Sequence, residues 1–157
     1  MNNLIKAIIS IAVPLGVGAA GSLFTTPEIK DWYLTIQKPD WNPPDWVFGP
    51  VWTLLYILMG IAFYLVWKNE VANKSIKKTA ITLSAIQLVL NFCWSYIFFG
   101  CHQVGWALVE IGVLWLFILL CSIFFARISK AAAWLLVPYI AWVSFAAVLN
   151  YTIWELN

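Results

Sequence analysis

The chain of 157 residues is dominated by apolar side chains: 63% of its residues are hydrophobic, 10% are charged, and the formal net charge is +2. A water-soluble domain carries about a quarter charged residues, so these charges are too few to coat a globule in water. The chain has no basic stripe or basic tail, which argues against a nucleic-acid partner. The composition therefore predicts an integral membrane protein whose main surroundings are the lipid bilayer.

Five apolar runs are long enough to cross a bilayer, which takes about 20 helical residues for each span. Together they use most of the chain, and no internal repeat points to an inverted-repeat transporter. We therefore expect an all-α integral membrane protein, a single bundle of five transmembrane helices. The expected helices cover residues 5–24, 46–67, 79–99, 105–126 and 131–154, with a long loop at 25–45.

Basic residues are divided unevenly between the two ends of this expected bundle. One end holds Lys6, Lys68, Lys74, Lys77, Lys78, Arg127 and Lys130. The other end holds only Lys30 and Lys38. Because basic loops stay in the cytoplasm, we expect a cytoplasmic N-terminus, with loop 25–45 and the C-terminus outside a bacterial-type plasma membrane.

The segment between the first two expected helices is the longest polar stretch of the chain. Residues 25–46 hold four of the seven acidic residues and four of the seven prolines. Prolines restrict φ and remove backbone donors, so this loop can hold Trp41 and Trp46 in place over the helix ends. Two interpretations stay open: a lid over a binding site and an anchor at the membrane surface, which Trp also suits.

Three of the expected helices carry aromatic and amide side chains near the end that faces this loop. The sets are Trp52 and Tyr56; Asn91, Trp94, Ser95 and Phe98; and Pro138, Trp142, Ala146 and Asn150. Their spacing places each set on one helix face. Asn side chains are costly against lipid, so these faces should turn into the bundle. Both an ordinary aromatic core and a pocket for a large planar ligand fit this pattern.

Three segments resemble signature segments of the TspO/translocator family. They are WYLTIQKPDWNPPDWVFGPVWTLLYILMG, QLVLNFCWSYIFFG and VPYIAWVSFAAVLNYTIW. The pattern WxPPxWVFxPVWTxLY within the first of them is long and specific. The likeness covers nearly the whole chain, which on these segments is similar to bacterial members of the family.

The resemblance implies a five-helix bundle that is a homodimer in bacteria, with a cavity near the first loop. That cavity would bind porphyrins, such as protoporphyrin IX or haem, and drug-like ligands of the isoquinoline-carboxamide and benzodiazepine types. No cofactor is required. Carried over by position, the ligand-binding residues are Trp32, Tyr33, Pro43, Pro44, Phe48, Trp52, Tyr56, Asn91, Trp94, Phe98, Trp142, Ala146 and Leu149.

One part of the family pattern is incomplete here. Animal members carry a C-terminal sterol motif of a branched residue, Tyr, and then Arg or Lys. Leu149 and Tyr151 are present, but Glu155 stands where the basic residue is needed. The motif is only a weak pattern even when complete, so the resemblance does not extend to sterol binding.

Two other classes of function stay open beside a tetrapyrrole receptor. A proton-coupled transporter needs an ionisable group inside the membrane, and Glu110 is the only candidate. An acid–base enzyme has no machinery here, because the single histidine, His102, lies at a turn. Light-dependent degradation of a bound porphyrin would need fewer catalytic side chains, since the porphyrin itself absorbs the light and carries the chemistry. The resemblance assigns Trp52 and Trp142 to that catalytic role.

Small residues predict close helix packing, either inside one chain or between two copies. The first helix carries the run from Gly16 to Ser22, and the third carries Ala80 and Ser84 four residues apart. Such pairs let helices approach closely, and the resemblance favours the third helix as the dimer seam. Cys93, Cys101 and Cys121 show no metal-binding spacing, so we expect no metal site.

Overall fold

The computed structural model describes residues 2–157, and every regular element in that range is helical. In chain order the elements are α1 (Asn3–Ile29), α2 (Trp32–Thr35), α3 (Asp45–Trp67), α4 (Lys74–Ser95), the π-helical turn η1 (Tyr96–Gly100), α5 (Val104–Ala126), α6 (Lys130–Leu135) and α7 (Val137–Leu156). Five helical segments are long and apolar enough to cross a membrane. The prediction of an all-α bundle of five transmembrane helices is confirmed.

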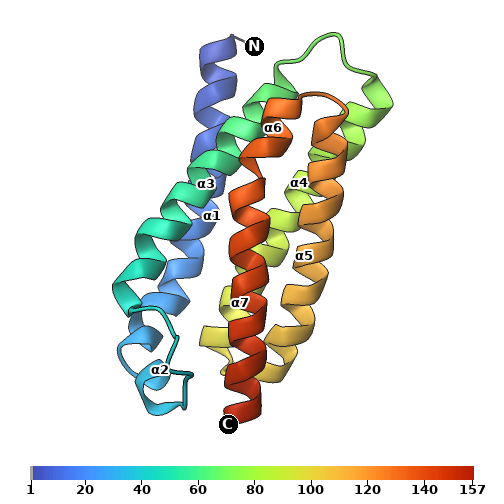
Figure 1. Cartoon of the computed structure of the whole chain (residues 1–157). Helices are drawn as coiled ribbons and strands as arrows, with labels where there is room; N and C mark the ends of the chain where they lie inside the picture. Colours follow the sequence, from blue (N-terminus) through green and yellow to red (C-terminus); the bar gives the residue numbers. More distant parts are fainter. Residues whose placement is uncertain (1) are drawn as a thin grey trace.

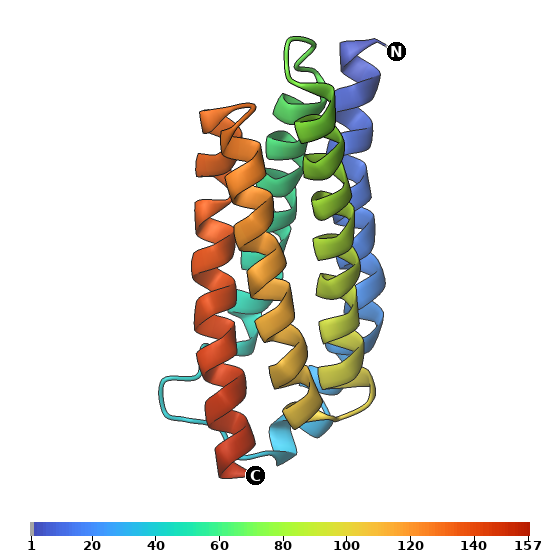
Figure 2. The ribbon, with the colours of Figure 1, turned by 90° about the vertical axis from the view of Figure 1, so that its right-hand side faces the viewer.

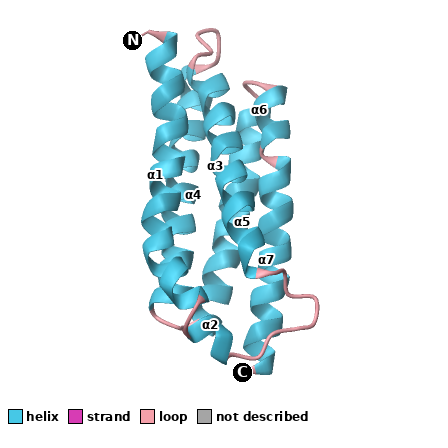
Figure 3. Cartoon of the chain, turned by 90° about the vertical axis from the view of Figure 1, so that its left-hand side faces the viewer, coloured by secondary structure: helices cyan, strands magenta, loops and turns pink. Residues whose placement is uncertain are grey.

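The long helices stand side by side along one common axis (Figure 1). The N-terminus and α6 lie at one end, and α2 and the C-terminus lie at the other, which we call the loop end (Figures 1 and 3). Helix α1 packs on α3 and α4, while α5 packs on α4 and α7. The view in Figure 2 shows α4, α5 and α7 running nearly parallel to the axis. The arrangement leaves the loop-end halves of α1, α3, α4 and α7 around a shared interior.

Helix α1 is longer than the sequence indicated, because it runs through Pro27 to Ile29. Contacts with a distant part of the chain support this last turn. The ring of Phe24 packs edge-on against Tyr96 at 5.2 Å, and Glu28 pairs with His102 at 2.8 Å. A proline costs a helix one donor, and these contacts offset that loss. The expected loop at 25–45 is therefore reduced to residues 30–44, with the short helix α2 inside it.

The last span is interrupted, where the sequence indicated one helix over 131–154. Helix α6 ends at Leu135, and α7 begins at Val137 with Pro138 in its first turn. Proline lacks the backbone N–H that would continue the hydrogen-bond ladder, and its fixed φ suits the first turn of a new helix. The break therefore follows directly from Pro138.

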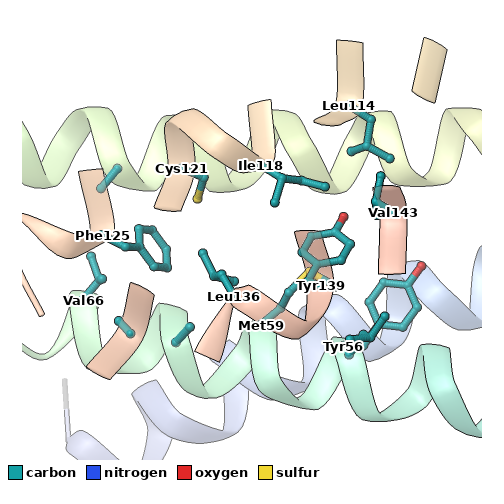
Figure 4. Packing of buried hydrophobic residues seen from close by; sticks show 14 of the residues in the cluster. Tyr56, Met59, Val66, Leu114, Ile118, Cys121, Phe125, Leu136, Tyr139 and Val143 are labelled. Carbon is teal, nitrogen blue, oxygen red and sulfur yellow. The ribbon is translucent and has the colours of Figure 1, made fainter. Parts of the chain in front are cut away.

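The main core lies in the half of the bundle away from the loop end. The buried side chains of Val66, Phe125, Leu136 and Tyr139 meet there, as Figure 4 shows. Ala80 and Ser84 are also buried, with 0% and 6% of their surface exposed. This pair of small residues therefore packs inside a single chain and does not form an outward-facing seam.

A close approach of two backbones joins α1 to α3. A Cβ added at Gly60 would lie 2.7 Å from the Ile11 Cα atom and from the Ser10 carbonyl oxygen. Only glycine leaves room for this contact. Farther along the pair, Gly18 makes room for the ring of Tyr56, which would lie 2.3 Å from an added Cβ.

A candidate ligand-binding cavity

A cavity of about 680 Å³ opens between α1, α3, α4 and α7 toward the loop end of the bundle. Nine of the thirteen residues expected to bind ligand lie on its wall. They are Tyr33, Phe48, Trp52, Tyr56, Trp94, Phe98, Trp142, Ala146 and Leu149. Trp32, Pro43, Pro44 and Asn91 do not line it.

The aromatic part of the wall comes from three helices whose rings touch one another. Trp52 and Tyr56 on α3 have ring centroids 5.7 Å apart, as their four-residue spacing requires. Phe48 meets Trp142 of α7 edge-on at 6.2 Å. Trp94 stacks on Phe98 at 5.0 Å on the third side. Such mutual contacts hold flat ring faces in fixed positions around the cavity.

Hydrogen bonds orient one of these indoles and leave another free. Trp94 donates from Nε1 to Asn150 Oδ1 at 3.1 Å, and Asn150 donates in turn to the Val104 carbonyl oxygen at 2.9 Å. The Nε1 of Trp142 is buried and has no hydrogen-bond partner among the described residues. A buried N–H group normally has a partner, so this indole N–H is an unsatisfied polar group in the cavity wall.

Asn91 lies behind the wall and not on it. It is 2% exposed, accepts from the Tyr56 hydroxyl at 2.5 Å, and donates to the Tyr139 hydroxyl at 2.8 Å. The Tyr139 hydroxyl in turn donates a hydrogen bond to Gln87 Oε1 at 2.8 Å. Asn91 therefore positions Tyr56, which does line the cavity. The sequence placed Asn91 correctly on the interior face of its helix. It could not show that two tyrosine hydroxyls would take up the hydrogen bonds of the Asn91 amide.

Trp32 also supports the wall from outside. Its ring stacks on His102 with centroids 4.3 Å apart and planes inclined by 8°, and it meets Phe98 edge-on at 5.6 Å. His102 Nε2 is 2.8 Å from Glu28 Oε2. Trp32, His102 and Glu28 form a clasp, as we call these three residues. It joins the end of α1 and α2 to the turn before α5.

The loop that carries Pro43 and Pro44 is held by polar contacts to its neighbours. The Tyr33 hydroxyl donates to Asn42 Oδ1 at 2.8 Å, and Lys38 Nζ donates to the carbonyl oxygen of Tyr33. Burial, and next the charge of Asp45, raise the pKa of the Tyr33 hydroxyl well above its ordinary value. The phenol therefore stays protonated and keeps its role as a donor. Pro44 directly precedes α3 and starts that helix.

Known proteins resemble this chain over nearly its whole length. The sequence model of the TspO/MBR family matches residues 10–155. The chain belongs to the TspO/MBR family. It is 48% identical to the tryptophan-rich protein TspO of Chlorobaculum tepidum, over 97% of this chain and 98% of the relative. It is 43% identical to TspO of Archaeoglobus fulgidus over 99% of both chains, and 42% identical to the translocator protein of Homo sapiens over 87% and 81%.

Membership in the TspO/MBR family confirms the resemblance noted in the sequence, and the chain is a TspO-type integral membrane protein. The structure adds wall residues that the sequence reasoning missed. They are on the polar side of α1 and the first turn of α3: Ser22, Thr25, Thr26, Lys30 and Asp45. Thr25, Thr26 and Lys30 were missed because α1 was expected to end at residue 24. The helical spacing of residues 19, 22, 26 and 30 is the signal that would have found them.

Glu110, the candidate for proton coupling, is separate from the cavity of this TspO-type protein. It is 9% exposed, and both of its carboxyl oxygens are buried without a hydrogen-bond partner among the described residues. Helix α5 carries it between Ala107 and Ile111, two residues of the buried face. No path from the cavity to Glu110 is built from the hydrogen bonds of residues 2–157.

Proposed function

We propose that the cavity binds porphyrins such as protoporphyrin IX or haem, together with planar drug-like ligands of the isoquinoline-carboxamide and benzodiazepine types. One observation carries the proposal: rings from three helices surround a space of about 680 Å³. Ligand sites typically occupy about 300–1,000 Å³ and combine apolar walls with a few polar groups. A receptor needs no cofactor beyond the ligand itself.

The wall suits a broad flat ligand because its rings face the cavity from different directions. Stacked and edge-on contacts add to the burial of apolar surface by about 0.5–1.5 kcal/mol for each pair. The indole ring of Trp142 lines the cavity, and the amide of Asn150 is held in place beside Trp94. The ring system is therefore bound by several faces, and the polar groups set its orientation.

The proposal is tested by titrating purified protein with protoporphyrin IX and following the shift of the porphyrin absorbance. Absorbance is preferred because replacing a tryptophan alters the protein's own fluorescence. Trp52→Leu removes a ring of the wall and should weaken binding about tenfold. The matched control is Trp134→Leu, at a side chain that is 73% exposed on α6 at the opposite end. Unsaturable binding, identical in all variants, would mean that the porphyrin only partitions into detergent.

The positions of Trp52 and Trp142 favour a second function, light-dependent oxidation of the bound porphyrin by dioxygen. Both indoles line the cavity, so a bound chromophore would lie against oxidisable rings. The porphyrin would carry the chemistry, and the protein would position it. Illumination in air should then bleach protoporphyrin faster with protein than in detergent alone. Equal rates would exclude this function.

We also propose a homodimer that forms through the outward face of α4. Ala85, Ile86 and Val89 lie on that face, and Val89 is 62% exposed. Ala85→Trp should then convert a dimer in detergent to a monomer, as measured by light scattering. Val148→Trp on the exposed face of α7 is the control. A mass that Ala85→Trp does not change would place any seam elsewhere.

A further inference from the structure

The wall of the cavity carries two charged side chains, both at its rim. Lys30 follows the last residue of α1, and Asp45 occupies the first turn of α3. Both residues are exposed at the mouth, whereas Trp52, Tyr56 and Trp142 are less exposed and lie deeper. The charge on a ligand must therefore be accommodated at the mouth, between α1 and α3.

The ammonium of Lys30 is free. Lys30 Nζ makes no hydrogen bond or ion pair within residues 2–157. Lys38, the other lysine of this end, differs, because its Nζ donates to the carbonyl oxygens of Tyr33 and Ile36 and lies 4.6 Å from the Tyr33 ring centroid. Lys30 is thus the cation at the rim that is available to a ligand.

The hydroxyls of Ser22, Thr25 and Thr53 on the cavity wall are poor partners for an anion. The hydroxyls of Ser22, Thr25 and Thr53 donate to the carbonyl oxygens of Ala19, Gly21 and Gly49 in their own helices. Their oxygens then face the cavity mainly as acceptors, which repel a carboxylate. The faces of aromatic rings carry negative charge density as well. A carboxylate buried among the rings would lose most of its hydration, and that is costly.

We propose that Lys30 Nζ binds the carboxylate of a carboxylate-bearing planar ligand, such as a porphyrin, at the rim and thereby sets its orientation in the cavity. The ring system then points inward to Trp52 and Trp142. Asp45, across the mouth, repels the carboxylate and directs it to the α1 side. This assignment rests on the proposed function, because it names the ligand class and orientation of the same cavity. It makes Lys30 a residue that orients the ligand.

The test compares two probes that differ only in charge, protoporphyrin IX and its dimethyl ester, in a neutral detergent. Lys30→Gln should weaken binding of the free acid about fivefold and leave the ester unchanged. Asp45→Asn should strengthen binding of the acid and leave the ester unchanged. Salt at 0.5 M, a concentration at which the Debye length is only about 4 Å, should reduce both effects.

Lys6→Gln is the matched control, because it removes the same charge from the opposite end of α1. If the Lys30→Gln and Lys6→Gln variants bind the acid equally well, Lys30 does not bind the carboxylate, although the cavity still binds porphyrin. If Lys30→Gln weakens acid and ester equally, its effect is on the fold, and the assignment also fails. A wild-type protein that binds neither probe saturably overturns the proposed function together with this inference.

Discussion

Asn91 shows how much of the cavity depends on a residue that does not line it. Its amide joins the hydroxyls of Tyr56 and Tyr139 in a chain that ends at Gln87. All four side chains are buried. A buried polar group that loses its partner costs about 1–3 kcal/mol. The network therefore stabilises the bundle and at the same time fixes the ring of Tyr56 on the cavity wall.

Replacing Asn91 by Ala should lower the stability of the protein by about 1–3 kcal/mol, because two buried hydroxyls lose a partner. A thermal-unfolding scan in detergent measures the change. The control is Asn3→Ala, since Asn3 is exposed and its side chain makes no hydrogen bond. Equal melting temperatures for the two variants would show that water replaces the Asn91 amide without loss.

Two glycines two residues apart provide a sharper test of the wall. A Cβ at Gly18 would overlap the Tyr56 ring at 2.3 Å, whereas a Cβ at Gly16 meets nothing within 4 Å. Gly18→Ala should displace Tyr56 and weaken protoporphyrin binding several-fold. Gly16→Ala should leave binding unchanged and stabilise the helix by about 0.5–1 kcal/mol. Loss of binding in both variants would mean that α1 tolerates no change here, whatever the position of Tyr56.

At the scale of the elements, the approach of α1 to α3 is set by Gly60. The backbone atoms of Ser10 and Ile11 leave no room for a side chain there. Gly60→Ala should force the two helices apart and cost about 1–3 kcal/mol. Gly112→Ala on α5 is the control, because a Cβ there meets nothing within 4 Å. Melting temperatures in detergent compare the two, and a stable Gly60→Ala variant would show that α1 can shift without cost.

The clasp of Trp32, His102 and Glu28 joins elements that are far apart in the sequence. His102→Ala removes both the stacking on Trp32 and the contact with Glu28. Backbone amides of residues 30–36 should then exchange with deuterium faster, while those of α5 stay protected. Gln103→Ala, next to it in the same turn, is the control. Unchanged exchange at 30–36 would mean that the polar contacts of Tyr33 and Lys38 hold the loop without the clasp.

At the scale of the whole molecule, the charge distribution favours one orientation in the membrane. We propose that the loop end faces outward and that the end with Lys68, Lys74 and Lys130 faces the cytoplasm. Cys101 is exposed at the loop end, and Val71 is 97% exposed in the loop at the opposite end. These two positions can therefore report the side of the membrane on which each end lies.

A membrane-impermeant maleimide applied to intact bacterial cells should label Cys101. In a Cys101→Ser background, Val71→Cys should be labelled only after the cells are lysed, because it lies on the cytoplasmic side. Cys93 and Cys121 are partly or fully buried and serve as internal references. Labelling of Val71→Cys in intact cells would reverse the proposed orientation.

Local sequence patterns were sufficient for the parts of the structure that depend on the solvent and on helix periodicity. Apolar runs long enough to span a bilayer become helices because lipid leaves backbone groups no other partner. The four-residue spacing of Trp52 and Tyr56, and of Trp142 and Ala146, puts both pairs on the cavity wall. The break before α7 was not predicted, because the apolar run continues through Pro138, although that residue has no N–H to donate.

Only the tertiary structure decided where polar and charged groups find partners. Whether Asn91 faces a ligand or two tyrosines depends on residues 35 and 48 positions away in the sequence. The extension of α1 past Pro27 depends on Phe24 and Glu28 meeting residues of η1 and the following turn. That extension places Lys30 at the rim of the cavity. The sequence by itself determined a TspO-type helical membrane bundle, because hydropathy and periodicity act locally. The hydrogen-bond partners of polar side chains, in contrast, depend on contacts that exist only after the helices have packed.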